Sequence, residues 1–182
     1  MARIKVIKYE KSEGELKSTF ELIEKRRRLS DVLKVQSLHP ASIKSHTNFY
    51  MDIMCSKTAL TRAEKEMIAV IVSAINRCLY CQSHYGAALN AYWKNLERVE
   101  QLKQDYRNTG LSEKEIAMCA FSVHLNKEPG NHEGQDFTNT LKEHNLSDEA
   151  ILDIVLVTSY YNFVNRMVLA LGVELEEHGY KY

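Results

Sequence analysis

Two cysteines, Cys78 and Cys81, stand three residues apart in the sequence Cys-Leu-Tyr-Cys. Residues at this spacing lie on one face of a helix, so the two sulfurs are close enough to form a disulfide. If the pair opens a helix, free backbone amides and the helix dipole stabilise a thiolate, which is the reactive form of cysteine. Arg77 adds positive charge beside the pair. The pattern predicts thiol–disulfide redox chemistry.

Two further residues are candidates for moving protons at this pair. His84 follows Cys81 by three residues, about one helical turn, and can reach the second sulfur. Glu66 lies twelve residues before Cys78, and one continuous helix would hold them about 18 Å apart. If the helix ends near residues 76–77 and the chain turns, the carboxylate can approach the start of the next helix. Burial there would raise its pKa and make it a general base.

Other uses of a cysteine pair are possible in principle. Zinc could be bound if Cys119 or His124 completed the ligand set, but structural zinc sites usually show a second clear ligand pair, and none is visible. Covalent haem attachment needs histidine directly after the second cysteine, where Gln82 stands. The cysteines can also be buried as small hydrophobic residues. A thioredoxin-type site needs a βαβ unit, which the helical pattern does not offer.

The elements that must position these residues are helices. Two prolines and seven glycines in 182 residues permit long helices nearly everywhere. Thr61 with Glu64, and Ser112 with Glu115, form capping-box patterns that start two of them. Strand signals are confined to residues 4–7, so the predicted fold class is all-α. Apolar spacing and punctuation predict helices over residues 14–29, 40–55, 62–76, 79–107, 112–126, 134–144 and 147–171.

Composition excludes several classes of protein. Lysine plus arginine (24) equals aspartate plus glutamate (24), and a protein that grips nucleic acid through its phosphates normally shows a basic excess. The charged N-terminus lacks the apolar core of a signal peptide, and no run approaches the roughly 20 apolar residues that span a bilayer. We therefore expect a cytoplasmic protein without nucleic-acid or membrane partners. In that compartment the four cysteines do not indicate a disulfide framework, and Cys55 and Cys119 are expected to be structural.

At these residues the sequence resembles the carboxymuconolactone decarboxylase-like superfamily, in particular its alkylhydroperoxidase D (AhpD)-like, peroxidase-related branch. The resemblance rests on Glu66 twelve residues before the first cysteine, and on a Cys-x-Tyr-Cys core with a following histidine. It extends to His39 and Pro40 and to the ending Tyr-Asn-Phe-Val-Asn-Arg at residues 161–166. It thus covers most of the chain from about residue 30 onward.

The resemblance implies one AhpD-like helical bundle that assembles as trimers or hexamers, with no cofactor and no metal. The single domain would comprise an N-terminal helical extension over residues 1–38, a core with the cysteine pair over 39–128 and C-terminal helices over 129–182. Near-zero net charge also mildly favours an oligomer.

The resemblance also implies a peroxidase cycle. Cys81 would attack the O–O bond of a hydroperoxide and become a sulfenic acid, and Cys78 would then resolve it into a disulfide. Glu66 would act as the base through a histidine or a water molecule. An external dithiol, thioredoxin-like or lipoyl, would restore the thiols.

The sequence departs from the family pattern at Tyr85. The family's proton-relay histidine falls four residues after the second cysteine, and this chain has tyrosine there. Adjacent helical residues differ by about 100° in direction, so His84 need not replace the missing imidazole. A tyrosine hydroxyl, with a pKa near 10, passes a hydrogen bond but is a poor base at pH 7.

Two alternatives to a peroxidase remain. One is a decarboxylase-type member of the superfamily that acts on a cyclic lactone acid, in which the cysteines would be incidental. Retention of both cysteines argues against it. The other is a non-catalytic redox-sensing protein whose Cys78–Cys81 pair oxidises without turnover. The missing histidine keeps this option open.

Overall fold

The structure is a computed structural model that describes residues 2–25, 29–131 and 137–176 of the 182-residue chain. Across these ranges every regular element is helical, which confirms the predicted all-α class. The main helices are α1 (Gly14–Glu24), α2 (Asp31–Lys34), α3 (Pro40–Tyr50), α4 (Arg62–Ile75), α5 (Leu79–Trp93), α6 (Leu96–Gln104), α7 (Glu113–Lys127), α8 (Phe137–Glu143) and α9 (Asp148–Leu171). Shorter turns are η1 (Tyr9–Lys11), η2 (Met51–Cys55), which is π-helical, and η3 (Tyr106–Asn108).

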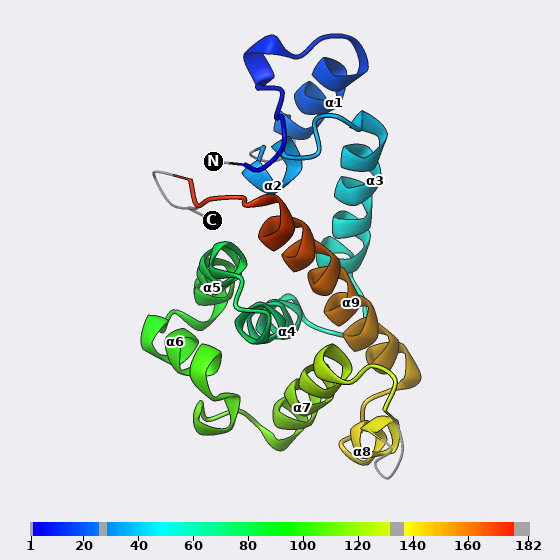
Figure 1. The fold of residues 1–182 in the computed structure, drawn as a ribbon. Helices are drawn as coiled ribbons and strands as arrows, with labels where there is room; N and C mark the ends of the chain where they lie inside the picture. The colour runs from blue at the N-terminus through cyan, green and yellow to red at the C-terminus, as the bar shows by residue number, and fades with distance from the viewer. Residues whose placement is uncertain (1, 26–28, 132–136, 177–182) are drawn as a thin grey trace.

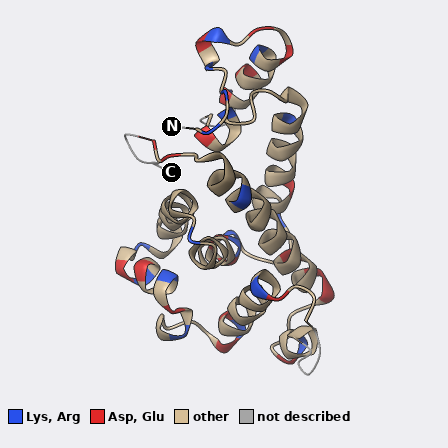
Figure 2. Cartoon of the chain, viewed as in Figure 1, with Lys and Arg blue, Asp and Glu red and all other residues tan. Residues whose placement is uncertain are grey.

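Helix α4 forms the centre of the core. It packs against α5, α7 and α9, and these three helices surround it in Figure 1. Residues 65–73 of α4 are all buried, and residues 67–72 are apolar at every position rather than along one stripe. Charged side chains are sparse on α9 and abundant on the peripheral α6 (Figure 2). The helix that carries Glu66 is therefore held on several sides.

Two helix starts follow the predicted capping chemistry. Thr61 begins α4: its backbone N–H donates to the Glu64 carboxylate at 2.8 Å, while its hydroxyl accepts from the backbone N–H of Glu64. Ser112 and Glu115 repeat the arrangement at the start of α7. Reciprocal bonds of this kind satisfy amides that have no partner within the helix. Both capping-box predictions are confirmed.

Three predicted helix boundaries differ from the structure. The predicted helix 79–107 is interrupted after α5, because Lys94 takes a left-handed conformation (φ 51°) and the Asn95 side chain caps α6 by accepting from the Arg98 amide. The predicted helix 40–55 ends as an α-helix at Tyr50 and continues as the π-helical turn. The predicted helix 14–29 ends at Glu24, and residues 26–28 lie outside the described residues. The first residues of the predicted helix 134–144, residues 134–136, also lie outside the described residues.

The strand signal at residues 4–7 marks an extended segment without a strand partner in the described part of the chain. Arg3, the residue before this segment, lies against the end of α9. The backbone N–H of Arg3 donates to the Leu171 carbonyl at 2.8 Å, and its guanidinium donates to the carbonyls of Leu169 and Ala170. The last carbonyls of a helix lack partners within the helix, so this contact stabilises the end of α9. The N-terminal segment and the residues after α9 thus lie side by side (Figure 1).

Helix α9 is long and apolar enough to cross a membrane by length and composition alone, contrary to the expectation that no such run exists. In this fold 44% of its apolar window is buried, and the helix packs against α4 and α7. Buried Thr158 donates to Ser122, and buried Asn165 accepts from Ser73. These contacts place α9 as a core helix of the bundle.

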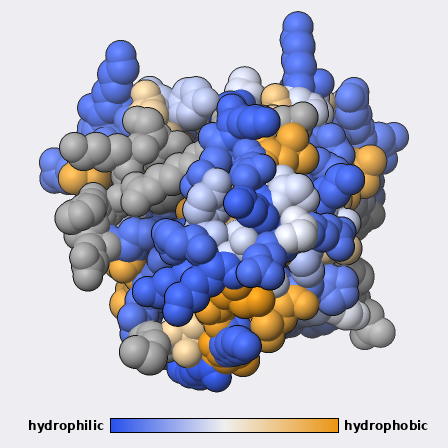
Figure 3. Space-filling view, turned by 90° about the horizontal axis from the view of Figure 1, so that it is seen from above, coloured by the Kyte–Doolittle hydropathy of each residue, from blue (hydrophilic) through white to orange (hydrophobic). Residues whose placement is uncertain are grey.

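The surface is mixed in polarity. Seen from the end that carries α1, it is mainly hydrophilic, with hydrophobic side chains gathered in small patches (Figure 3). Around the molecule, several large apolar side chains are more than half exposed: Leu38, Leu79, Tyr92, Leu96 and Leu152. Leu79 is the most exposed of these and lies between the two cysteines in sequence.

Candidate active site

A tight turn between α4 and α5 positions the cysteine pair. Helix α4 ends at Ile75, Arg77 takes a left-handed conformation (φ 54°), and Cys78 becomes the N-cap of α5. The backbone N–H of Cys78 donates to the Ser73 carbonyl at 3.0 Å, which closes the turn. The helix therefore ends near residues 76–77, as the predicted approach of Glu66 to the next helix requires. Cys81 falls in the first turn of α5, where backbone amides lack helical partners.

The two thiols are in direct contact. Cys78 and Cys81 are reduced and fully buried, with their sulfurs 2.8 Å apart. The hydrogen bond between the two thiols, together with one from the Cys81 backbone, lowers the pKa of Cys78 and outweighs burial. Burial raises the pKa of Cys81, and its partner sulfur raises it further. Of the two thiols, Cys78 therefore gives up its proton more readily than Cys81.

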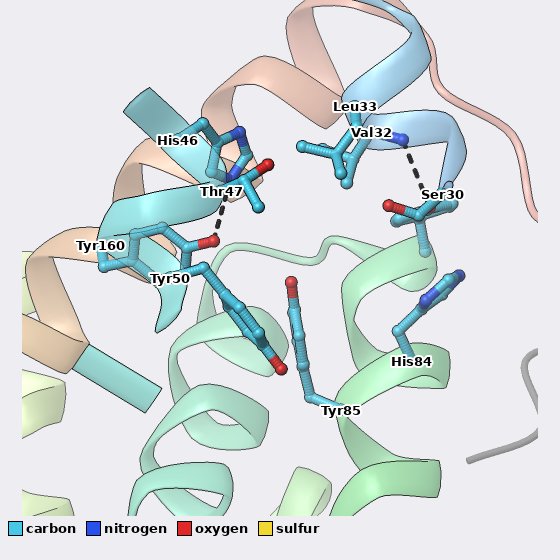
Figure 4. A pocket seen from close by; sticks show the side chains of 10 residues that line it. Ser30, Val32, Leu33, His46, Thr47, Tyr50, His84, Tyr85 and Tyr160 are labelled. Atoms are coloured by element: carbon cyan, nitrogen blue, oxygen red, sulfur yellow. Dashed lines mark hydrogen bonds between the residues drawn. The ribbon is translucent and has the colours of Figure 1, made fainter. Parts of the chain in front are cut away.

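A small enclosed cavity of about 20 Å³ lies beside this face of α5 (Figure 4). A space of this size holds about one small polar molecule such as water. Successive residues of a helix differ by about 100° in direction. Viewed along the axis of α5, Cys81 therefore points in a direction between those of His84 and Tyr85, and it lies one turn before them. Cys81 therefore shares a helical face with these two lining residues, but neither cysteine is itself part of the cavity wall. The lining residues are Ser30, Val32, Leu33, His46, Thr47, Tyr50, Tyr80, His84, Tyr85 and Tyr160.

Polar atoms dominate the cavity wall. His46 and Tyr160 are joined by a 2.8 Å hydrogen bond between the ring nitrogen Nε2 and the phenolic oxygen (Figure 4). Ser30 is 3% exposed, and its hydroxyl has no hydrogen-bond partner in the described structure. A buried hydroxyl without a partner costs free energy, so this wall favours a polar guest.

His84 lies in the cavity wall and is held by a carboxylate. Its ring nitrogen Nε2 is 2.8 Å from Glu176, a residue that follows the last helix, and its ring stacks on Tyr80 with centroids 4.1 Å apart. Sequence reasoning missed Glu176, which is 92 positions away from His84. No motif marks this glutamate, since it lies in a short charged stretch after α9.

Tyr85 occupies the position where the family has histidine, and it is largely buried. Its ring packs edge-to-face on Tyr161, with centroids 4.4 Å apart, and it also lines the cavity. Tyr161 is fully buried, and burial raises its pKa well above the ordinary value of 10. Tyr50 and Tyr160 complete a cluster of phenol rings beside α5. A protonated phenol can donate or accept a hydrogen bond here, but the Tyr161 phenol is no base at neutral pH.

Glu66 is buried against Arg62 one turn earlier on α4. One carboxylate oxygen accepts from the guanidinium nitrogens Nε at 2.7 Å and Nη2 at 2.6 Å, while the other has no hydrogen-bond partner. Burial raises the pKa of Glu66 to about 6, against the opposing effect of Arg62. Arg62 also donates to the Tyr50 hydroxyl at 2.7 Å. Glu66 is therefore linked to the cavity wall through Arg62 and Tyr50.

Replacing Glu66 by glutamine is expected to remove a pH dependence of stability between pH 4.5 and pH 6. The folded protein binds this proton more tightly than the unfolded chain, because the pKa rises from 4.5 to about 6. The free energy of unfolding of the wild type therefore falls as pH rises through this window, by about 2 kcal/mol. Urea unfolding of both proteins across the window measures the difference. Parallel pH dependences of the two would contradict the prediction.

The remaining cysteines and the Asn-Arg ending have structural surroundings. Cys119 is fully buried in the core, as expected, whereas Cys55 is exposed and accepts from an Arg62 Nη1 at 3.1 Å. Cys55 is the last residue of the π-helical turn that follows α3. Buried Asn165 holds Ser73, whose carbonyl anchors Cys78.

Comparison with known proteins agrees with this architecture. The profile of the carboxymuconolactone decarboxylase family matches residues 40–100, which include the α4–α5 turn. A peroxidase-related protein from Silicibacter sp. TM1040 is 30% identical, with a TM-score of 0.82 over 91% of this chain and 86% of that one. An alkylhydroperoxidase AhpD core protein from Ralstonia eutropha JMP134 is 26% identical, with a TM-score of 0.85 over 97% and 93%. The protein YdfG of Bacillus subtilis (strain 168) is 23% identical over 122 residues, 67% of this chain and 82% of its own length.

These similarities and the helical fold define the class of protein. The chain belongs to the AhpD-like, carboxymuconolactone decarboxylase superfamily, as its sequence indicated. The superfamily is associated with enzymes, both peroxidase-related and decarboxylase-like.

Proposed function

We propose that this protein is a thiol-dependent peroxidase that reduces hydroperoxides through a disulfide between Cys78 and Cys81. One observation carries the proposal: the two reduced thiols lie with their sulfurs 2.8 Å apart at the start of α5, just before His84 and Tyr85, which line a small polar cavity. Carboxymuconolactone-type decarboxylation needs neither thiol. A sensor needs the pair but no catalytic turnover.

The proposed cycle balances with a dithiol as the reductant. The Cys81 thiolate attacks one peroxide oxygen, the O–O bond breaks, and the leaving alkoxide or hydroxide takes up a proton. The Cys78 thiol then attacks the Cys81 sulfenic acid, which forms the disulfide and releases water. An external dithiol reduces the disulfide and becomes oxidised itself. The net reaction converts one hydroperoxide and one dithiol into an alcohol, water and a disulfide.

The two sulfurs are close enough to exchange a proton directly. The proton between the sulfurs has only a 2.8 Å hydrogen bond to cross, so transfer to Cys78 produces the Cys81 thiolate. Cys81 shares a helical face with the cavity-lining His84 and Tyr85, which supports its role as the attacking thiol. Glu66 is proposed to act as the base through a water molecule, while the permanently charged Arg62 holds its carboxylate and the Tyr50 hydroxyl in place.

Partners and location are part of the same proposal. The reductant is a thioredoxin-like or lipoyl dithiol, and a reducing cytoplasm would keep the pair in the thiol form. Assembly into trimers or hexamers is supported by the large apolar side chains that remain exposed on the isolated chain. No nucleic acid or membrane is proposed as a partner.

Addition of one equivalent of hydrogen peroxide or cumene hydroperoxide to the reduced protein tests the proposal. We expect the mass to fall by about 2 Da as two thiols become one disulfide, and peptide mapping to join Cys78 to Cys81. With excess dithiothreitol and peroxide, turnover should continue. Disulfide formation without turnover would instead support a redox sensor, and unchanged thiols would reject both thiol-based functions.

A further inference from the structure

The segment after α9 reaches back to the cysteine-bearing helix through one residue, Glu176. Its carboxylate lies 2.8 Å from Nε2 of His84 and accepts from the Tyr80 hydroxyl at 3.0 Å. The backbone N–H of Asp31, at the start of α2, donates to it at 3.2 Å. One side chain thus joins the C-terminal segment to two helices that are distant in sequence.

The contact between Glu176 and His84 is buried, unlike an ion pair on the protein surface. The side chains of His84 and Glu176 are only 6% and 9% exposed. Burial alone would raise the pKa of Glu176, but the hydrogen bond from His84 and the backbone donors lower it to about 2. The carboxylate is therefore ionised near neutral pH. A buried carboxylate that loses its hydrogen-bond donors costs free energy. Glu176 therefore favours the one arrangement that keeps its donors around it.

Both side chains that Glu176 holds form part of the cavity wall. Tyr80 and His84 line the cavity, and they flank Cys81 on α5. The Tyr80 hydroxyl also accepts from the Val32 amide at 3.4 Å, so the same cluster fixes α2 over the cavity. Releasing Glu176 would loosen the C-terminal segment, α2 and the orientation of the His84 ring together.

We propose that Glu176 is a positioning residue that sets the orientation of His84 and holds the C-terminal segment and α2 closed over the first turn of α5, thereby limiting access to Cys78 and Cys81. This inference deepens the proposed function, since it adds a gate to the same site. The contact itself is independent of whether peroxide is the substrate.

Glu176→Gln removes the charge while keeping the size of the side chain. We expect iodoacetamide to modify Cys78 and Cys81 about tenfold faster in this variant, because a hydrogen-bonded charge that keeps the segment closed is lost. Mass spectrometry of peptides reads each cysteine separately. Exposed Cys55 serves as the accessible reference, and Cys119, in the core, reports global unfolding.

Three further measurements separate positioning from a general structural role. Glu174→Gln, in the same segment but exposed, is the matched control and should alkylate like the wild type. Glu176→Asp keeps the charge and should recover part of the protection. The ¹⁵N signals of His84 should show Nε2 protonated in the wild type and a changed tautomer balance in Glu176→Gln, since the partner of a ring nitrogen sets the tautomer.

The outcomes are distinct from those that test the peroxidase. Faster alkylation confined to Cys78 and Cys81 supports the inference, whether or not the wild type reduces peroxide. Unchanged alkylation and an unchanged His84 tautomer in Glu176→Gln would overturn it, even in an active peroxidase. Equal acceleration at Cys119 would also overturn it, because the effect would then be global destabilisation.

Discussion

Cys81→Ser is expected to lower peroxide turnover about a thousandfold or more, because a serine hydroxyl stays protonated and cannot replace a nucleophilic thiolate. The loss should appear in kcat/KM with dithiothreitol as the reductant. Since the hydroxyl is close in size to the thiol and the site is buried, circular dichroism and thermal unfolding should show that the variant remains folded.

Cys78→Ser is the matched control for this result. It should also lose efficient turnover, but in this variant a sulfenic acid at Cys81 should accumulate, because no neighbouring thiol resolves it. Dimedone followed by peptide mass spectrometry detects that species. The opposite pattern, a sulfenic acid on Cys78 in Cys81→Ser, would assign the attack to Cys78, the thiol whose pKa is lowered.

Tyr85→His is expected to raise kcat/KM for peroxide reduction, by up to about a hundredfold. The substitution puts an imidazole where the family relay histidine falls, one turn after Cys81 and in the cavity wall. An imidazole with an ordinary pKa near 6.5 accepts a proton at neutral pH, whereas a phenol with a pKa near 10 does not. The variant should lose some stability, because the ring contact with Tyr161 is removed. Stopped-flow oxidation and thermal unfolding measure the two effects.

Tyr85→Phe separates the ring from its hydroxyl. It preserves packing on Tyr161, so we expect little change in stability, and little change in rate if the hydroxyl transfers no proton. A large loss of activity in Tyr85→Phe would show that the phenol itself takes part. A folded Tyr85→His protein with the wild-type rate would show that proton transfer runs elsewhere, with Glu66 as the next group to test.

Local chemistry explains which parts of the fold were predictable. The capping boxes at Thr61 and Ser112 are complete within four residues, so the starts of α4 and α7 followed directly from the sequence. The break at Lys94 was missed, because a lysine in a left-handed conformation leaves no clear mark in the sequence. Asn95 was the available signal, since asparagine favours the N-cap position. The π-helical turn that ends at Cys55 was not predicted, because no sequence pattern marks such a turn.

The sequence alone determined one property of Cys78 and Cys81, namely that their sulfurs lie close together. The three-residue spacing and the helix start put both sulfurs on one face, and these are local properties. Only the tertiary structure decided what surrounds them. The Glu66–Arg62 contact depends on burial from several helices, and the contact between His84 and Glu176 spans 92 positions. Burial and long-range contacts arise from packing of the whole chain, so they set pKa values and access to the site in ways that no local pattern encodes.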